Sequence, residues 1–489
     1  MLNKFFVALS LLATTSPAVM SADNEKTLKG SKPNIILVMT DDQGYGDLAC
    51  HGHPFVKTPN LDKLYTQSTR FTDFHASPTC APTRAALMSG NAPFKNGITH
   101  TILERERMTL KTTTVAEMLK EAGYTTGIFG KWHLGDDDEY QPDNRGFDEV
   151  FIHGAGGIGQ NYPGTQGAVP GTSYFDPFIK HNGQIVKTKG YCTDVFFKQA
   201  LGWMKEQKEK PFFAYIATNA PHGPFIVADN YKEMYATDCK VDKQRAFFGM
   251  ITNIDENMGL LMDKLEKWDL ADNTVLIYMT DNGSAVGSRI FNAGMKGGKG
   301  STNEGGSRVP LFMRLPGKIK PGVDVDRMAR HYDMVPTLVE MAGGKFPAGR
   351  DGRSLVPLIE DPKTEWKDRN TFFHAGRWNK AGAGDRWGKG DTTPEGSKYK
   401  KFAVRNEKWR LVGKALYDVE ADPGETKDLS SQYPEIAAEM LKSFDAWWLE
   451  VRPLMVNEDA PLDTGKPFIE LYRKQKAAGG IPNWKEPSL

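Results

Sequence analysis

The stretch Pro33-Asn34-Ile35-Ile36-Leu37-Val38-Met39-Thr40 determines the fold class of this chain of 489 residues. Its central side chains are all apolar, whereas a strand with one face in water would alternate apolar and polar residues. A continuous apolar run of this length is typical of a strand that is buried on both faces within a parallel sheet. Residues 212–218 and 274–280 have the same character, so we expect three strands of one buried sheet.

Helical patterns lie between these strands. Thr58-Pro59 marks the start of one helix, because threonine is favoured at the N-cap and proline at the first helical position. Strands that alternate with helices predict an α/β fold, in which helices sandwich a large, doubly wound, parallel or mixed sheet. The longer helices are expected at residues 112–122, 191–208 and 243–268.

The pattern changes near residue 365, where short strands follow one another with little between them. They predict a smaller C-terminal subdomain with an antiparallel sheet and a helix. We therefore expect a catalytic domain at residues 23–365 and a subdomain at residues 366–489. The expected strands are residues 402–405, 409–412 and 416–419, and the helix is residues 433–448.

The N-terminus has the features of an export signal. Lys4 precedes a short apolar core, and small residues follow up to Ala22. We therefore expect residues 1–22 to be a signal peptide and the protein to be exported, either to a periplasm or outside the cell. The apolar core is too short to span a bilayer and no later segment looks transmembrane, so we expect no stable membrane insertion.

Composition excludes some classes of partner. The formal net charge is +1, so nothing in the overall charge favours binding to nucleic acid. Four cysteines are too few for a disulfide framework, although the sequence leaves open whether Cys192 and Cys239 are bridged.

Polar side chains follow two of the predicted strands. Asp41 and Asp42 come directly after the first, and Asp281 and Asn282 come after the third. Ligands bind at this carboxyl edge in open α/β sheets, and two adjacent carboxylates repel each other unless a cation lies between them. Oxygen ligands of this kind predict a Ca²⁺ site or, as the weaker alternative, a Mg²⁺ site.

Cys80 is followed by proline and arginine at fixed offsets, in Cys80-Ala81-Pro82-Thr83-Arg84. A buried structural cysteine needs only apolar neighbours. Residues 84–88 read as a helix that ends at Gly90, which places Cys80 at or just before a helix N-terminus. The free N–H groups and the dipole of a helix favour an anion at this end.

Two further segments combine cations or histidines with a strand end. Lys131 and His133 follow a predicted strand at 125–129 and would point the same way in an extended segment. His222 follows the second buried strand and is flanked by prolines, which restrict the backbone around it. A cation and a titratable imidazole suit an anionic ester.

The Cys80, Pro82, Arg84 pattern resembles the maturation motif of the type I sulfatases, the formylglycine-dependent family of the alkaline phosphatase superfamily. Residues 296–310 resemble the family's Gly-Lys-Gly-x-x-x-Glu-Gly-Gly segment, with Lys299 as the matching lysine and Lys296 as the alternative register. Residues 416–425 resemble its C-terminal region. One departure is residues 91–93, Asn-Ala-Pro, where many relatives carry Arg-Tyr-Pro.

The resemblance implies a set of roles for the residues already noted. A formylglycine-generating maturation enzyme would oxidise Cys80 to formylglycine, whose hydrate is the nucleophile and which Arg84 would hold. Lys131 and Lys299 would neutralise the sulfuryl oxygens, His222 would protonate the leaving oxygen, with or without help from Lys299, and His133 would act as the base that releases sulfate. The implied metal ligands are Asp41, Asp42, Cys80, Asp281 and Asn282.

The sequence therefore predicts an exported sulfatase that acts on sulfated carbohydrates. Tryptophans beside arginines at residues 377–378 and 386–387 favour this substrate, because indoles stack on sugars and guanidiniums pair with sulfate. The alternatives are an aryl or small-alkyl sulfatase, a phosphodiesterase or phosphonate hydrolase of the same superfamily, and a non-catalytic sulfated-glycan binder in which Cys80 stays a thiol.

Overall fold

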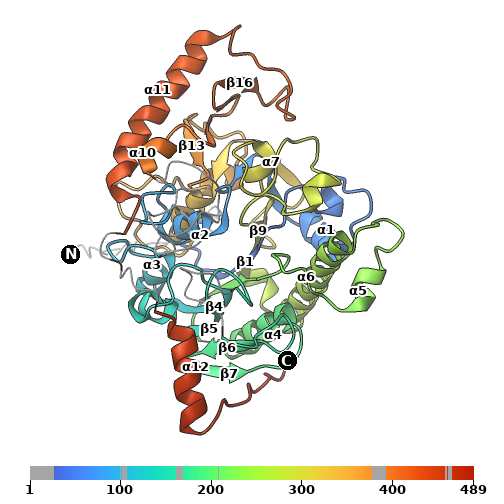
Figure 1. Cartoon of the computed structure of the whole chain (residues 1–489). Helices are drawn as coiled ribbons and strands as arrows, with labels where there is room; N and C mark the ends of the chain where they lie inside the picture. Colours follow the sequence, from blue (N-terminus) through green and yellow to red (C-terminus); the bar gives the residue numbers. More distant parts are fainter. Residues whose placement is uncertain are drawn as a thin grey trace, which may run out of the picture.

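A ten-stranded mixed sheet crosses the molecule, with helices on both faces (Figure 1). The computed structural model describes residues 27–99, 101, 107–160, 169–207, 209–376, 393–457, 460 and 465–489. The strand order is β11 (Val323–Val325), β2 (Thr69–Phe71), β10 (Leu311–Arg314), β9 (Thr274–Thr280), β1 (Asn34–Thr40), β8 (Phe212–Ala217), β4 (Thr125–Lys131), β5 (Glu149–His153), β6 (Phe178–His181) and β7 (Gln184–Lys187).

The centre of this sheet is parallel and most pairs towards its edges are antiparallel. Strand β1 pairs in parallel with β8 and β9, and β4 pairs in parallel with β8 and β5. Strands β10, β6 and β7 run antiparallel to their neighbours, and β11 is parallel to β2. The predicted doubly wound mixed sheet is confirmed, and the three expected buried strands are β1, β8 and β9.

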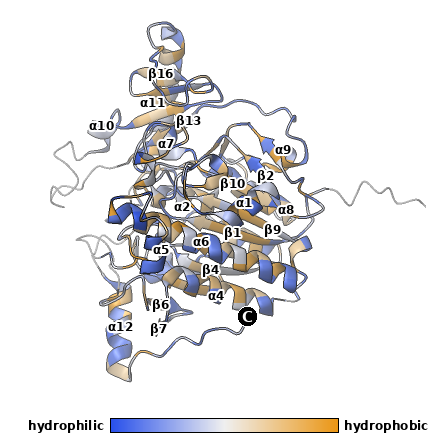
Figure 2. Ribbon diagram, turned by 90° about the vertical axis from the view of Figure 1, so that its right-hand side faces the viewer, coloured by the Kyte–Doolittle hydropathy of each residue, from blue (hydrophilic) through white to orange (hydrophobic). Residues whose placement is uncertain are grey.

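The side chains of β1 alternate between two cores, one on each face of the sheet. Ile35, Leu37 and Met39 belong to one core, and Ile36 and Val38 belong to the other. Burial of each such side chain contributes about 1.5–3 kcal/mol. Figure 2 shows the hydrophobic residues concentrated in these central strands. The helices over the first face are α2 (Cys80–Ser89), α3 (Val115–Glu121), α8 (Met334–Met341) and α9 (Val356–Glu360), and those over the second are α1 (Pro59–Thr66), α4 (Cys192–Glu206) and α6 (Asp242–Lys267).

A second, four-stranded antiparallel sheet lies at one end of the molecule. Its order is β13 (Thr371–His374), β14 (Phe402–Arg405), β15 (Trp409–Val412) and β16 (Ala415–Asp418). Helix α11 (Pro434–Val451) packs its aromatic side chains against this sheet. The predicted small antiparallel sheet and helix are confirmed, and β13 is an additional strand. The short elements are β3 (Phe74–His75), α5 (Asp229–Glu233), α7 (Glu304–Ser307), β12 (Ala329–Arg330) and α10 (Pro394–Ser397).

The chain returns to the large sheet after α11. Helix α12 (Pro467–Ala478) lies beside β7, at the opposite end of the molecule from α11 (Figure 1). The indole N–H of Trp484 donates to Gln199 Oε1 at 2.7 Å, and the Trp484 amide donates to Lys187 O at 2.9 Å. The domain boundary at residue 366 stays a proposal, to which the structure adds that this C-terminal segment packs on the large sheet.

Two further features bear on the expectations from sequence. All four cysteines are free thiols, so Cys192 and Cys239 are not bridged. The expected signal peptide lies outside the described residues, and among the described helices none combines the length and the apolar character needed to cross a bilayer.

Gly130 provides a test of how tightly β4 is held against β8. Its φ is +113°, and a Cβ added there would lie 2.0 Å from Ala217 O. We expect Gly130→Ala to lower the free energy of unfolding by about 1–3 kcal/mol, because the strand end that carries Lys131 must move away from β8. Urea unfolding measures this change.

The matched control is Gly465→Ala, since a Cβ at Gly465 meets nothing within 4 Å. Equal stability of the two variants would show that the β4–β8 contact tolerates a side chain.

Candidate active site

Five parallel strands end at one edge of the large sheet, and the segments that follow them carry the polar residues singled out in the sequence. These segments follow β1, β4, β5, β8 and β9. The lysine loop (residues 296–307) and the start of α2 reach the same edge, through contacts with the turns after β1 and β9. The residues brought together are Asp41, Asp42, Cys80, Arg84, Lys131, His222, Asp281, Asn282 and Lys299.

The turns after β1 and β9 are joined through their acidic residues. The Asp42 amide donates to Asp281 Oδ1 at 3.1 Å, and the Asn282 side-chain amide donates to Asp42 Oδ1 at 3.0 Å. Asp41, Asp281 and Asn282 have no exposed surface, and Asp42 is 2% exposed. The predicted neighbourhood of these four residues is therefore present.

Three cations neutralise the three buried carboxylates. Lys131 Nζ lies 2.5 Å from Asp41 Oδ2. Arg84 Nη2 lies 2.8 Å from Asp281 Oδ2, and Lys299 Nζ lies 2.6 Å from Asp42 Oδ2. The formal charges of these six side chains sum to zero. A divalent cation among them would leave a net positive charge, which favours an anionic ligand.

The pKa values of Asp41 and Asp281 are shifted in opposite directions. Burial raises the pKa of Asp41, but the charge of Lys131, together with smaller contributions from His222 and Arg84, holds that pKa well below its usual range. Burial and then the charge of Asp41 raise the pKa of Asp281 well above its usual value. This opposition is typical of carboxylates that share a site.

Cys80 is the first residue of α2, as the sequence predicts. It is 2% exposed, and its Sγ lies within 4.8 Å of carboxylate oxygens of both Asp41 and Asp281. The helix ends at Gly90 with φ +73°. The N-terminus of α2 thus points its free N–H groups towards the same edge as the cations.

His222 and His133 have different surroundings. Nδ1 of His222 lies 2.6 Å from Gly223 O, and its Nε2 lies 3.7 Å from Asp42 Oδ2. Burial, with a smaller effect from Lys299, lowers the pKa of His222 to about 4, so the ring is neutral at pH 7. Nε2 of His133 lies 2.8 Å from Thr101 O. Strand β4 ends at Lys131 and His133 has φ +61°, so the extended geometry expected for this pair does not continue to His133.

The structure distinguishes the two lysines of the glycine-rich segment. Lys299 contacts Asp42, whereas Lys296 Nζ donates to Glu425 O at 3.4 Å and lies over the ring of Tyr417. The register that matches Lys299 to the family motif is the one that brings a lysine to the carboxylates.

The donor set fits a hard cation. Asp41 Oδ1 and Asn282 Oδ1 are buried and have no hydrogen-bond partner among the described residues. A buried oxygen without a partner costs about 1–3 kcal/mol, and a cation would satisfy both atoms. Carboxylate and amide oxygens are the ligands that Ca²⁺ and Mg²⁺ prefer.

Three residues near the site were missed in the sequence. Tyr215, from the middle of β8, is near Arg84: burial raises the pKa of its hydroxyl, and the charge of Arg84 opposes that shift. His153 ends β5 beside Lys131, and burial lowers its pKa to about 3. The Gln160 side-chain amide lies 3.5 Å from His222 Nε2. Of these three, only His153 could have been found from sequence, because it lies at the carboxyl end of a parallel strand, as the residues after β1 do.

Two family models and several known proteins match this chain. A family model described as Sulfatase matches residues 33–344, and one described as N-sulphoglucosamine sulphohydrolase, C-terminal, matches residues 299–447. Human arylsulfatase A is 33% identical over 359 residues, which cover 67% of this chain and 68% of the relative. Human N-acetylgalactosamine-6-sulfatase is 32% identical over 371 residues, which cover 70% of this chain and 68% of the relative.

A solved structure also matches this chain over most of its length. The crystal structure of Ps i-CgsB in complex with k-i-k-neocarrahexaose superposes with a TM-score of 0.75 at 28% identity. The superposition covers 89% of this chain and 94% of that chain. The likeness therefore extends over most of both chains.

Proposed function

The chain belongs to the sulfatase family and hydrolyses sulfate esters, and from this premise we propose that it is exported and removes sulfate from sulfated carbohydrates. The observation that carries the proposal is the cluster around Cys80, in which three carboxylates and three cations surround the N-terminus of α2. Relatives named for N-acetylgalactosamine-6-sulfate and a neighbour solved with a carrageenan oligosaccharide support a carbohydrate substrate. The arginine–tryptophan pairs that favour sugars lie outside the described residues.

Cys80 is the proposed source of the nucleophile. A formylglycine-generating maturation enzyme would convert it to formylglycine, whose hydrate supplies one hydroxyl to attack sulfur and a second that allows sulfate to leave with return of the aldehyde. We propose Asp281 as the base that accepts a proton from residue 80, because one of its carboxylate oxygens lies within 4.8 Å of Cys80 Sγ. Arg84 holds Asp281 at 2.8 Å and so orients this base.

The cations are the proposed binding groups for the sulfuryl oxygens. Lys131 and Lys299 pair with Asp41 and Asp42, and we propose that their ammonium groups also contact oxygens of a bound ester. Their charge stabilises the negative charge that moves onto the sulfuryl and leaving oxygens in the transition state. The metal, for which we propose Ca²⁺ before Mg²⁺, would be held by Asp41, Asp42, Asp281, Asn282 and residue 80, and would supply further positive charge for the same oxygens.

Two histidines are the proposed proton carriers. Nε2 of His222 faces the site and would protonate the leaving oxygen once the charge of a bound ester favours the imidazolium form. His133 would accept the proton from the second hydroxyl as sulfate leaves. Its ring is 3% exposed and thus shielded from bulk water.

We expect purified protein to release sulfate from a sulfated oligosaccharide and to carry an aldehyde at position 80. A panel of sulfated oligosaccharides with detection of released sulfate, and mass spectrometry of the peptide that contains residue 80 after reaction with an aldehyde probe, measure both. Cys80→Ala is the matched control and should lose both signals. Full activity of protein that carries only a thiol at position 80 would exclude formylglycine, and activity on phosphate esters alone would exclude the proposed substrate class.

We expect Ca²⁺ to raise the melting temperature of chelator-treated protein and to restore turnover. A ligand at 100 times its dissociation constant raises the free energy of unfolding by about 2.7 kcal/mol. Asp42→Asn should lose most of this shift, whereas Asp324→Asn, on the edge strand β11, should keep it. Undiminished turnover of metal-free protein would contradict the cation site, and a larger effect of Mg²⁺ would change the assigned ion.

We expect His222→Ala to lower turnover of a sulfated sugar by about 10²–10⁴-fold and that of 4-nitrophenyl sulfate by far less. A sugar alkoxide needs a proton as the S–O bond breaks, whereas nitrophenolate leaves without one. His181→Ala, on β6 and away from the site, is the control and should leave both rates unchanged. Equal losses on the two substrates would mean that His222 only binds the ester.

A further inference from the structure

The lysine loop (residues 296–307) touches three parts of the active site. Beyond the contact of Lys299 with Asp42, the Lys299 amide donates to Ser284 O at 3.0 Å and the Gly300 amide donates to Pro78 O at 2.8 Å. The Gly283 amide donates to Gly306 O at 3.1 Å. One loop therefore links the turn after β9, the segment before Cys80, and the third cation.

The outer side of this loop is held by an arginine of the small sheet. Arg410, on β15, has no exposed surface. Its Nε donates to Thr302 O at 2.9 Å, its Nη1 to Glu304 Oε1 at 2.6 Å and its Nη2 to Ser307 Oγ at 3.0 Å. The planar guanidinium thus fixes three positions of the second half of the loop at once.

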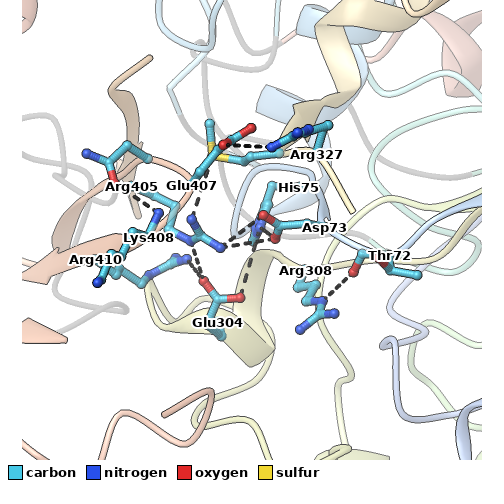
Figure 3. Close-up of polar contacts among 12 residues, drawn as sticks. Thr72, Asp73, His75, Glu304, Arg308, Arg327, Arg405, Glu407, Lys408 and Arg410 are labelled. Carbon is cyan, nitrogen blue, oxygen red and sulfur yellow. Dashed lines mark hydrogen bonds and ion pairs between the residues drawn. The ribbon is translucent and has the colours of Figure 1, made fainter. Parts of the chain in front are cut away.

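A second arginine adds to this attachment. Arg405, on β14, donates from Nε to Glu304 Oε1 at 3.0 Å and from Nη2 to both carboxylate oxygens of Asp73 at 3.1 Å. Figure 3 shows dashed lines from the Glu304 carboxylate to Arg405, Arg410 and His75, and from the Arg405 guanidinium to Asp73. Burial raises the pKa of Glu304, but Arg405, His75 and Arg410 outweigh it and keep the carboxyl ionised.

Oxygens of Asp73 and Glu304 and a nitrogen of His75 lie within 4.8 Å of one another, a spacing that a metal ion could use. Arg405 already binds oxygens of both carboxylates, and Arg410 binds Glu304 as well. Ion pairs with arginines therefore account for the cluster without a metal. The consequence of the network is that it holds the lysine loop in place.

The backbone of the lysine loop packs tightly, both within the loop and against the turn after β9. A Cβ at Gly306 would lie 2.0 Å from Ser301 O, and a Cβ at Gly283 would lie 2.0 Å from Gly305 O. Backbones this close cannot move independently. A shift of Glu304 would therefore displace the backbone at Gly283, next to Asn282, and the segment that carries Lys299.

We propose that Arg410 and Arg405 are positioning residues, through which the small sheet sets the place of Lys299 in the active site. This inference rests on the proposed function for its kinetic consequence, because Lys299 is there assigned to the sulfuryl oxygens. Its structural part, that the guanidiniums hold the lysine loop, stands independently and is tested first.

Hydrogen exchange of the full-length protein tests the structural part. Arg410→Lys keeps the positive charge but replaces the planar guanidinium, with its several N–H donors, by one ammonium group. That group cannot reach Thr302, Glu304 and Ser307 together. We expect amide exchange in residues 299–306 to become at least about tenfold faster, while exchange in β1 and β9 stays slow. Arg369→Lys is the matched control, because Arg369 pairs with Asp333 and donates to Asp351 O at 3.1 Å, and neither partner belongs to the loop. Unchanged exchange in Arg410→Lys would overturn the proposal.

A double-mutant cycle with 4-nitrophenyl sulfate tests the kinetic part. We expect Arg410→Lys to lower kcat about tenfold or more with KM within about twofold, as for a group that acts only on the transition state. In a Lys299→Ala background, the same change should lower kcat by less than about twofold, because the two residues act through one interaction. Arg369→Lys should leave kcat unchanged in both backgrounds.

The possible failures are distinguishable. Losses that multiply across the cycle, or a loosened loop with unchanged kcat, would overturn the positioning role of Arg410. Wild-type protein that carries formylglycine yet cleaves neither 4-nitrophenyl sulfate nor a sulfated oligosaccharide would overturn the proposed function, and the exchange experiment would still decide whether the small sheet holds the loop.

Discussion

The burial of three carboxylates and three cations at one edge of the large sheet is the constraint on which the rest of the structure depends. Removing these charges from water costs several kcal/mol per ion, and only close pairing with complete hydrogen bonding offsets that cost. The apolar strands β1 and β9 fix Asp41 and Asp281, and α2 and β4 supply Arg84 and Lys131 from either side. The third cation comes from a loop, so it needs support that the large sheet alone does not give.

The exposed fractions of these side chains indicate the side from which a substrate can reach the site. Asp41 and Lys131 have no exposed side-chain surface, whereas the side chains of His222 and Lys299 are 13% and 21% exposed. Under the proposed function, an ester would approach over His222 and Lys299 with its sulfuryl group foremost, and its alcohol part would stay on the outer side. This orientation would place the proposed acid beside the leaving oxygen.

The sequence predicted those parts of the structure that depend on local pattern. The buried strands β1, β8 and β9, the small sheet, and the grouping of Asp41, Asp42, Asp281 and Asn282 follow from apolar runs and from what comes after them. Arg405 and Arg410 could not be recognised, because an arginine among apolar residues of a short strand reads as a solvent-facing position. Only the packing of the small sheet on the lysine loop buries them. Tyr215 was missed for a similar reason, since nothing local distinguishes it within an apolar run.

The position of β1 in the sheet has a consequence for the synthesis of the chain. Its partner β9 begins with Thr274, which follows Asn34 by 240 residues. At about 5–20 residues per second, translation takes roughly 10–50 s to supply that partner, and pairing at such a separation is intrinsically slow. During this interval the most apolar segment of the domain has one or both edges open, and open apolar strands aggregate. A holdase chaperone that bound this segment would keep the newly made chain from aggregating until β9 had emerged.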